Sequence, residues 1–405
     1  MFDDAVSRRE FLRAGAAAGV TVAALPALAQ DKPAATQPAA LVPTRKLGRA
    51  DVEVSILNLG TTWGCNLRHL NVLHDEGIRF IDTAASYKGG ASEKCIGDWF
   101  EQTGRRKEYF VITKASPRTP EEWVAGVDER LQALRTDYLD VFFIHGLGDG
   151  KYGGEAGRDV PKDKEWAAAA ERMKKSGKVR FAGFSTHCNP IELRTALLNS
   201  AAEGGWVDVI MPATSPLLMR DNAEFNKALD ACYKTGIALI SMKECKGADG
   251  IREIMPDFEA RGLNKFTAVL TAMWSDERFV SVCSLMDNIQ KLRENAAAAR
   301  NFKPLTEKEM AAVADMLRDA RRTYCDACDG SCRRAAGTRA DLNTIARCVS
   351  YVEQNGQREE ARALFASLTP EARDWSGADL RAATHACKCH VDFAHVVEKA
   401  REYFA

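Results

Sequence analysis

The sequence has no excess of charge of either sign, because 56 lysine and arginine residues are balanced by 56 aspartate and glutamate residues. A balanced chain has no bulk positive field that would attract nucleic acid, so we expect no nucleic-acid partner. Beyond the N-terminal segment, the sequence also lacks an apolar run of the roughly 20 residues needed to cross a bilayer. We therefore expect no membrane anchor in the mature protein.

The first 43 residues differ in composition from the rest of the chain. A twin arginine, Arg8-Arg9, lies in SRREFLR and precedes a weakly apolar run, 14–28, which ends in a small-x-small cleavage site, Ala27-Leu28-Ala29. This segment resembles a twin-arginine export signal. It predicts a signal peptide over 1–29, a linker rich in Ala, Pro and Gln over 30–43, the twin-arginine translocase as a partner, and an exported, periplasmic protein. The alternative is an amphipathic or disordered leader.

From Arg45 onward, short apolar runs alternate with longer helical stretches. The runs that we expect to form strands are 54–59, 80–83, 110–114, 141–145, 181–185, 207–211, 238–242 and 280–284. Such alternation predicts a (β/α)8 TIM barrel over 44–303, with its site at the carboxyl ends of the strands. The loop 146–161 is long for such a barrel and is either a lid over the site or a mobile surface loop.

The alternation of strands and helices ends before the last hundred residues. Their pattern predicts a small α-helical, cysteine-rich domain over 304–405. Thr306 with Glu309 indicates a capping box for a helix that runs to about Tyr324. Two further helix starts are indicated by Thr369 before Pro370 and by Ser376 with Asp379.

Four polar residues follow or end predicted strands, and together they form a plausible proton relay: Asp82, Tyr87, Lys114 and His145. A neighbouring ammonium favours a phenolate, so Lys114 would lower the pKa of Tyr87 from about 10 towards working pH. Asp82 would hold the lysine in place, and the imidazole of His145 could orient a carbonyl oxygen for protonation. Each residue has a structural alternative, namely a helix cap, a solvated strand end or a core histidine, but their combination favours catalysis.

The segment 77–100, GIRFIDTAASYKGGASEKCIGDWF, resembles the signature of the aldo/keto reductase family. Two later segments resemble its further parts, 177–187 a barrel strand and 279–299 the cofactor-binding end, so the resemblance covers roughly residues 44 to 303. It implies an NAD(P)(H)-dependent oxidoreductase that acts on a small-molecule carbonyl or alcohol. It also implies that Tyr87 is the acid, with Lys114, Asp82 and His145 in support.

The same resemblance assigns the cofactor contacts by position. Ser185 would meet the nicotinamide carboxamide, Lys291 the 2′-phosphate, and Glu294 and Asn295 the adenine. The family usually has an arginine at the position of Lys291. A lysine carries a point charge and does not offer the two parallel hydrogen bonds of an arginine. The sequence departs from the family at four further positions, which leave the choice between NAD and NADP open: Thr186, Met211, Thr214 and Leu285.

The chain contains 12 cysteines. Those of the barrel are scattered, and single buried thiols behave as small apolar side chains, so core packing is expected for most of them: Cys65, Cys95, Cys188, Cys232, Cys245 and Cys283.

The other cysteines crowd the C-terminal region, with Cys325, Cys328 and Cys332 on one tight turn and a fourth candidate ligand at Cys387. This spacing grips a soft metal centre and resembles the ferredoxin-like tail of a subgroup of exported aldo/keto reductases, which implies one [4Fe–4S] cluster. No proline follows these cysteines, unlike in ferredoxins. Zinc, with His385 and His390, and disulfides are the alternatives.

The leading function is thus a carbonyl reductase whose tail could pass single electrons to an electron-transfer partner. The alternative is a catalytically altered barrel that serves as a metal-binding or electron-transfer module. A barrel hydrolase is excluded, because neither paired catalytic carboxylates nor a nucleophile elbow occurs. The loops 63–67 and 146–161 are expected to set substrate specificity.

Overall fold

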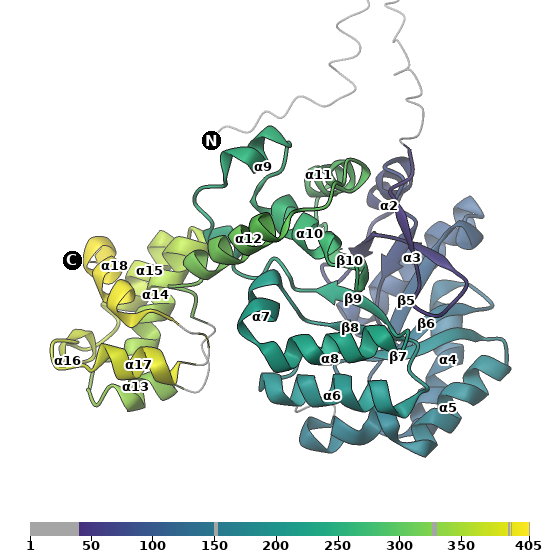
Figure 1. Ribbon diagram of the computed structural model, residues 1–405, viewed down its shortest axis with the longest axis horizontal. Helices are drawn as coiled ribbons and strands as arrows, with labels where there is room; N and C mark the ends of the chain where they lie inside the picture. The colour runs from purple at the N-terminus through teal and green to yellow at the C-terminus, as the bar shows by residue number, and fades with distance from the viewer. Residues whose placement is uncertain (1–39, 150–152, 326–329, 388, 390, 405) are drawn as a thin grey trace, which may run out of the picture. The chain divides into compact units, whose positions relative to one another are not determined.

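The computed structural model describes residues 40–149, 153–325, 330–387, 389 and 391–404, and a closed barrel of eight parallel strands lies at its centre (Figure 1). The strands are β3 (Leu57–Gly60), β4 (Phe80–Asp82), β5 (Phe110–Ala115), β6 (Leu139–Ile144), β7 (Val179–Thr186), β8 (Val209–Pro212), β9 (Ala238–Met242) and β10 (Phe279–Leu285). They follow one another in chain order, and β10 pairs with β3 to close the sheet. The predicted TIM-barrel fold is confirmed.

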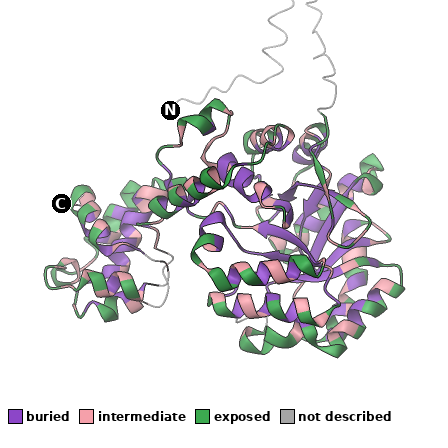
Figure 2. Ribbon diagram, in the orientation of Figure 1, coloured by how far each residue is buried: buried purple, intermediate pink, exposed green. Residues whose placement is uncertain are grey.

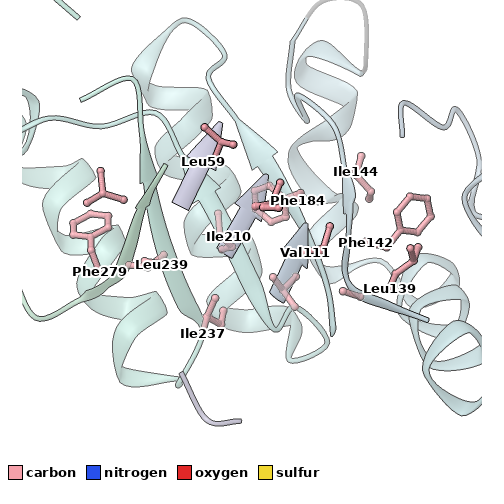
Figure 3. Close-up of a cluster of buried hydrophobic side chains, with 14 of the residues drawn as sticks. Leu59, Val111, Leu139, Phe142, Ile144, Phe184, Ile210, Ile237, Leu239 and Phe279 are labelled. Atoms are coloured by element: carbon pink, nitrogen blue, oxygen red, sulfur yellow. The ribbon is translucent and has the colours of Figure 1, made fainter. Parts of the chain in front are cut away.

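Both faces of the strands are buried, which explains their nearly continuous apolar sequences. On β6, Val141 and Phe143 point into the barrel interior, whereas Phe142 and Ile144 join the cluster between strands and helices. Figure 3 shows side chains of this outer cluster from several strands. At Gly183 of β7, a Cβ would lie 1.8 Å from the carbonyl oxygen of Val209, so β7 and β8 pair this closely only because the residue is glycine.

Helices cover the outside of the barrel, and most have a buried stripe and an exposed face (Figure 2), whereas the helix Lys265–Ser275 has no exposed residue. They are α2 (Leu67–Asp75), α3 (Ala91–Thr103), α4 (Pro120–Leu134), α5 (Lys164–Lys175), α6 (Ile191–Gly204), α7 (Pro216–Asp221), α8 (Ala223–Lys234), α9 (Pro256–Ala260), α10 (Lys265–Ser275) and α11 (Ile289–Arg300). Local sequence sets their ends: Thr119 caps α4 with Pro120 in the first turn, and Gly104 ends α3 at a φ of 69°.

The strand predicted over 54–59 is wrong in its extent, because the chain divides there into two strands of different sheets. β2 (Glu53–Ser55) pairs antiparallel with β1 (Thr44–Lys46), and only β3 enters the barrel. Leu47 and Val54 of this hairpin belong to the interior cluster of the barrel. The hairpin therefore closes the amino-terminal end of the barrel, and the apolar run was continuous because both segments are buried.

The C-terminal region is helical, as predicted. Its helices are α12 (Glu307–Ala320), α13 (Ser331–Ala335), α14 (Leu342–Asn355), α15 (Arg358–Ala366), α16 (Pro370–Arg373), α17 (Leu380–Ala386) and α18 (Phe393–Phe404). α12 packs on the barrel side, where Val313 and Leu317 share a core with Phe258 and Val269. The later helices enclose a core of their own, which includes Ile345 and Phe393 together with most of the tail cysteines.

The helix starts in this region were predicted well and one helix end was not. Thr306 and Glu309 form the predicted capping box, and Thr369 caps α16. α12 ends at Ala320, four residues short of the prediction, and Asp379 caps α17 as its N-cap residue rather than acting at the third position after Ser376.

The loop 146–161 has more regular structure than expected, since a 3-10 helix, η4 (Gly154–Lys162), occupies much of its described part and buries Pro161. Within the described ranges, no helix is both long and apolar enough to cross a membrane.

Candidate active site

The closed sheet delivers polar side chains to one end of the barrel. Asp82 is the last residue of β4, Lys114 lies near the end of β5, and His145 directly follows β6. Tyr87 opens the short 3-10 helix η1 (Tyr87–Gly90), which leads into α3. Because parallel strands end at the same edge, residues distant in the sequence meet here.

The Lys114 ammonium is the centre of this group. Its Nζ lies 2.5 Å from Oδ2 of Asp82, donates to the carbonyl oxygen of Thr83 at 2.9 Å, and approaches Oη of Tyr87 at 3.4 Å. The lysine and the aspartate are 1% and 2% exposed. A buried ammonium needs such partners, because an unpaired charge in this position would be costly.

The expected lowering of the Tyr87 pKa is wrong for the protein alone. Burial raises the pKa of Tyr87 to about 12, and the attraction of the Lys114 ammonium for the phenolate offsets only part of this rise. The phenol therefore stays protonated throughout the neutral pH range, as a proton donor must be.

His145 stands beside the tyrosine as a neutral imidazole. The two ring centroids are 5.6 Å apart in an edge-to-face arrangement, and Nδ1 of His145 lies 3.5 Å from Oγ of Ser86. Burial lowers the pKa of His145 to about 3, with help from the positive charges of Lys114, His187 and Lys243. The imidazole thus stays uncharged above strongly acidic pH and donates from one ring nitrogen only.

Two further residues support this group, and the sequence reasoning gave neither a role. The Cys283 thiol on β10 interacts electrostatically with Asp82 and Lys114, so it is a neighbour of the ion pair as well as a packing residue. Glu93 of α3 accepts a hydrogen bond from Thr113 at 2.5 Å and lies 3.1 Å from Nε of Arg130. Its position in the SEK segment after the tyrosine was the signal for Glu93, whereas Cys283 carried none.

The basic character of the site extends to the next strand ends. His187 follows β7 and pairs with Asp149, its Nδ1 lying 3.2 Å from the carboxylate. Lys243 directly follows β9 with a φ of 61°, a left-handed conformation that is unusual for a lysine. Such strained positions concentrate at functional sites.

The residues expected to hold a cofactor lie along β7, β10 and α11. Ser185 is buried, and its Oγ accepts a hydrogen bond from the backbone N–H of Gly146 at 3.1 Å. Asn295 donates to Oγ of Ser284 at 2.9 Å, and Glu294 accepts from Asn264 at 3.0 Å. Lys291 is half-exposed and pairs with Asp287 at 2.9 Å. The ion pair leaves less positive charge for a 2′-phosphate than a free lysine would.

Two buried oxygens at the same end of the barrel fit a bound polar molecule. Among the residues that the structure describes, Oγ1 of Thr214, after β8, and Oε2 of Glu244, after β9, have no hydrogen-bond partner. Burial raises the pKa of Glu244 to about 8, so this carboxyl is largely protonated and could donate. A nicotinamide carboxamide or ribose carries the donors and acceptors that such atoms require.

The departures from the family pattern have structural positions of different kinds. Met211 lies inside the barrel core and Thr186 donates to the carbonyl oxygen of Leu147 at 2.9 Å. Leu285 is 49% exposed at the end of β10. Leu285 therefore presents an exposed surface that a cofactor could cover, whereas Thr214 presents the buried hydroxyl described above.

The tail cysteines are brought together only in part. Cys332 and Cys387 are buried in one core and interact electrostatically, whereas Sγ of Cys325 lies 3.6 Å from the carbonyl oxygen of Asn343. Cys328 and His390 lie outside the described residues. Within the described part of the chain, no group of three or more His, Cys, Asp or Glu side chains is arranged to hold a metal ion.

An open groove of about 730 Å³ lies at the opposite end of the barrel, before β5 and β6, with Arg106, Arg135 and Tyr138 in its wall. The polar relay is not part of it. In barrels of this kind, the amino-terminal end of the strands serves stability and the carboxyl end carries the chemistry.

The fold is a TIM barrel with a buried polar relay at the carboxyl end of its strands. The profile of the aldo/keto reductase family matches residues 66–247. The matched segment, slightly less than half of the chain, contains Asp82, Tyr87, Lys114 and His145.

Three known proteins illustrate the relationship. An NADP(+) aldo-keto reductase of Schizosaccharomyces pombe is 31% identical over 49% of this chain and 60% of its own length, and the glyoxal reductase of Bacillus subtilis is 34% identical over 27% of this chain and 36% of its own. These alignments cover less than two thirds of either relative. The holo form of an aldo-keto reductase of Bacillus halodurans superimposes with a TM-score of 0.53 at 19% identity, over 69% of this chain and 96% of its own, which shows the shared fold.

Proposed function

We propose that this protein reduces the carbonyl group of small aldehydes or ketones with a reduced nicotinamide cofactor, using Tyr87 as the proton donor. One observation carries the proposal: a buried ammonium, Lys114, contacts both a carboxylate and a phenol at the carboxyl end of the barrel. In this arrangement the Lys114 ammonium can stabilise the phenolate that forms when Tyr87 donates its proton.

The steps follow from the geometry. The carbonyl oxygen of the substrate would lie between Oη of Tyr87 and the ring of His145, which face one another. Because Nδ1 of His145 is next to Ser86, Nε2 is the nitrogen available to the substrate. The phenol transfers its proton to the oxygen as negative charge develops there, and Lys114, held by Asp82, stabilises the phenolate that remains.

When bound, a reduced nicotinamide supplies the hydride for the carbonyl carbon. Ser185, Thr214 and Glu244 are the polar residues that would orient its ring and ribose, and Lys291, Glu294 and Asn295 are placed to meet its adenosine end. Fluorescence titration of NADH and NADPH onto the protein tests this assignment, and no response to either would contradict it.

The decisive experiment replaces the proton donor. The Tyr87→Phe variant should lose about 10²- to 10⁴-fold in kcat/KM for carbonyl reduction, because the general acid is gone. Its affinity for the reduced nicotinamide should be retained. Tyr109→Phe is the matched control, since Tyr109 is also buried, contacts His74, and precedes β5 at the other end of the barrel.

If Tyr87→Phe reduces carbonyls as fast as the unmodified protein, the reductase proposal fails. The barrel would then be a binding or electron-transfer module that has kept an ion pair for stability.

We infer the substrate class from the similarity to known reductases. The glyoxal reductase among them acts on a small dicarbonyl, as its name states. Glyoxal and methylglyoxal are therefore the first compounds to assay, followed by larger aldehydes, ketones and sugars. A preference for bulky sugars over dicarbonyls would overturn the small-carbonyl proposal while leaving the reductase proposal intact.

For the C-terminal region, we propose that Cys325, Cys328, Cys332 and Cys387 hold one [4Fe–4S] cluster. The support is their spacing in the sequence, the shared core of Cys332 and Cys387, and the electrostatic interaction between these two residues. A hydrogen bond from Cys389 lowers the pKa of Cys387 to about 7 against the opposing effect of burial, which favours the thiolate that metals require.

Anaerobic purification tests the cluster. A brown protein with iron and sulfide, bleached by dithionite, supports it, and Cys387→Ser should lose the metal whereas Cys348→Ser, a buried tail cysteine outside the proposed set, should keep it. Stoichiometric zinc in a colourless protein, or no metal and linked cysteines, would overturn the cluster in favour of zinc or disulfides.

We also propose export through the twin-arginine pathway, on the basis of the SRREFLR segment alone. Replacing Arg8 and Arg9 by lysine should abolish export, measured by cell fractionation. Unchanged distribution of this variant would refute the assignment.

A further inference from the structure

Two barrel cysteines lie in direct contact beside the site. Cys65 is in the loop 61–66, which follows β3, and Cys95 is on the second turn of α3, the helix that begins just after Tyr87. Their Sγ atoms are 2.6 Å apart. Unbonded sulfur atoms rarely approach one another so closely, and a shortening of about 0.5 Å would reach the length of a disulfide bond.

Both side chains are half-buried rather than enclosed in the core. Both pack against the main core, as expected for barrel cysteines, but they also contact each other. Cys232 provides the contrast, because it is fully buried on α8 and donates to the carbonyl oxygen of Leu198.

The two thiols differ in reactivity. Their mutual hydrogen bond lowers the pKa of Cys95 and, together with burial, raises that of Cys65. Thiolates, and not thiols, attack disulfides, so Cys95 is the residue suited to react first and Cys65 the one suited to resolve the product.

The backbone around the pair is already fixed. Ser92 of α3 donates to Oγ1 of Thr61 at 2.7 Å and lies 2.9 Å from Oγ1 of Thr83. Thr61 in turn donates to the carbonyl oxygen of Asp82 at 2.8 Å. A bond between the cysteines would link segments that these hydroxyls already hold together, so it requires little movement of the chain.

We propose that Cys65 and Cys95 form a reversible disulfide that ties the loop 61–66 to helix α3 next to the Asp82 and Tyr87 segments. The oxidant is a disulfide of low molecular weight. The Cys95 thiolate attacks one of its sulfur atoms and releases a first thiolate, and Cys65 then loses its proton and attacks Cys95 to release the second. The two cysteines are oxidised by two electrons and the oxidant is reduced to two thiols.

Trypsin separates the two cysteines, which makes the bond measurable. Cleavage after Arg49, Arg68, Lys94 and Arg105 places Cys65 in peptide 50–68 and Cys95 in peptide 95–105, each with no second cysteine. The full chain is equilibrated in glutathione buffers from fully reduced to fully oxidised, alkylated, digested and analysed by mass spectrometry. We expect the linked peptide pair in oxidised buffer, and both peptides alkylated in reduced buffer.

The thermal midpoint gives a second readout. Closing a loop across 30 residues should raise the Tm of the oxidised protein by roughly 5 °C relative to the Cys95→Ser variant in the same buffer. Cys232→Ser is the control that should keep both the linked peptides and the rise in Tm. Complete alkylation of both cysteines in the unmodified protein after equilibration in the most oxidising buffer would overturn the proposal, whatever the variants do.

Discussion

The mouth of the barrel and the C-terminal helices both gather reactive side chains, but they position them by different means. In the barrel, Asp82 of β4 pairs with Ile112 of β5. Lys114 therefore lies two residues beyond the partner of Asp82 on the neighbouring strand. In the tail, Cys332 comes from a short helix and Cys387 from the end of another, within a separate core. Backbone register fixes the first set, whereas side-chain packing alone fixes the second.

This difference has an energetic consequence. The barrel polar groups are charged, buried and mutually dependent, so removal of one leaves another uncompensated. The tail thiols are small and nearly apolar when protonated, so loss of one is tolerated by the fold unless a metal is bound.

The largest effect is expected from breaking the ion pair in the barrel. Lys114→Met should destabilise the protein by about 3–5 kcal/mol, because Asp82 is left as an unpaired buried charge. Urea unfolding measures this loss, and carbonyl reduction should also fail. Lys291→Met, which breaks an exposed pair with Asp287, is the control and should cost less than about 1 kcal/mol. Equal costs for the two variants would show that burial does not dominate here.

The next effect concerns acid. His145 has a folded pKa of about 3, below its unfolded value, so the unfolded chain binds more protons between these values. The stability that this histidine contributes is present above about pH 6.5 and is lost as the pH falls, by up to about 1.4 kcal/mol per pH unit. In urea unfolding at pH 6, 5 and 4, His145→Gln should lose stability less steeply than the unmodified protein. Parallel slopes would contradict the depressed pKa.

A smaller effect is expected from removing a helix N-cap in each of the two regions. Asp379 caps α17 in the separate tail core and Thr119 caps α4 on the barrel, each accepting a hydrogen bond from a backbone N–H in the first turn. Replacing either by alanine should cost about 1 kcal/mol. If the tail unfolds separately, Asp379→Ala will shift only one of two unfolding transitions in urea. A single shifted transition in both variants would show that the regions unfold together.

The smallest effect is expected at the exposed cofactor end. Because Asp287 neutralises Lys291, Asp287→Asn should strengthen NADPH binding by about two- to fivefold and leave NADH binding unchanged. Fluorescence titration with both cofactors measures the change. A similar gain for NADH would show that the charge does not act on a 2′-phosphate.

The sequence predicted the fold well where a local pattern is compatible with a single type of structure. Apolar runs ending in Asp82, Lys114 and Ser185 are buried parallel strands, and Thr306 with Glu309 is a capping box. The run 54–59 failed because burial looks the same in a hairpin and in a barrel strand. An apolar run indicates that both faces of a strand are buried, but it does not indicate which sheet the strand joins.

The candidate site was predictable to the same extent. Strand ends identified the side chains at the mouth, while the pKa of Tyr87 was expected to move the wrong way. The sequence showed that the Lys114 ammonium would lower the pKa of Tyr87, but it did not show the larger, opposite effect of the burial of Tyr87. Cys283 and the contact between Cys65 and Cys95 also gave no signal, since nothing in the spacing distinguishes a packing thiol from a partnered one.

The amino-acid sequence by itself determined the strand and helix alternation and the identity of the polar residues that end the strands, because these depend on apolar periodicity and local capping. Only the tertiary structure decided which of those groups touch, which are dehydrated and which are left without partners. Closure of the sheet sets distances between residues far apart in the chain, and those distances and the exclusion of water control the charges.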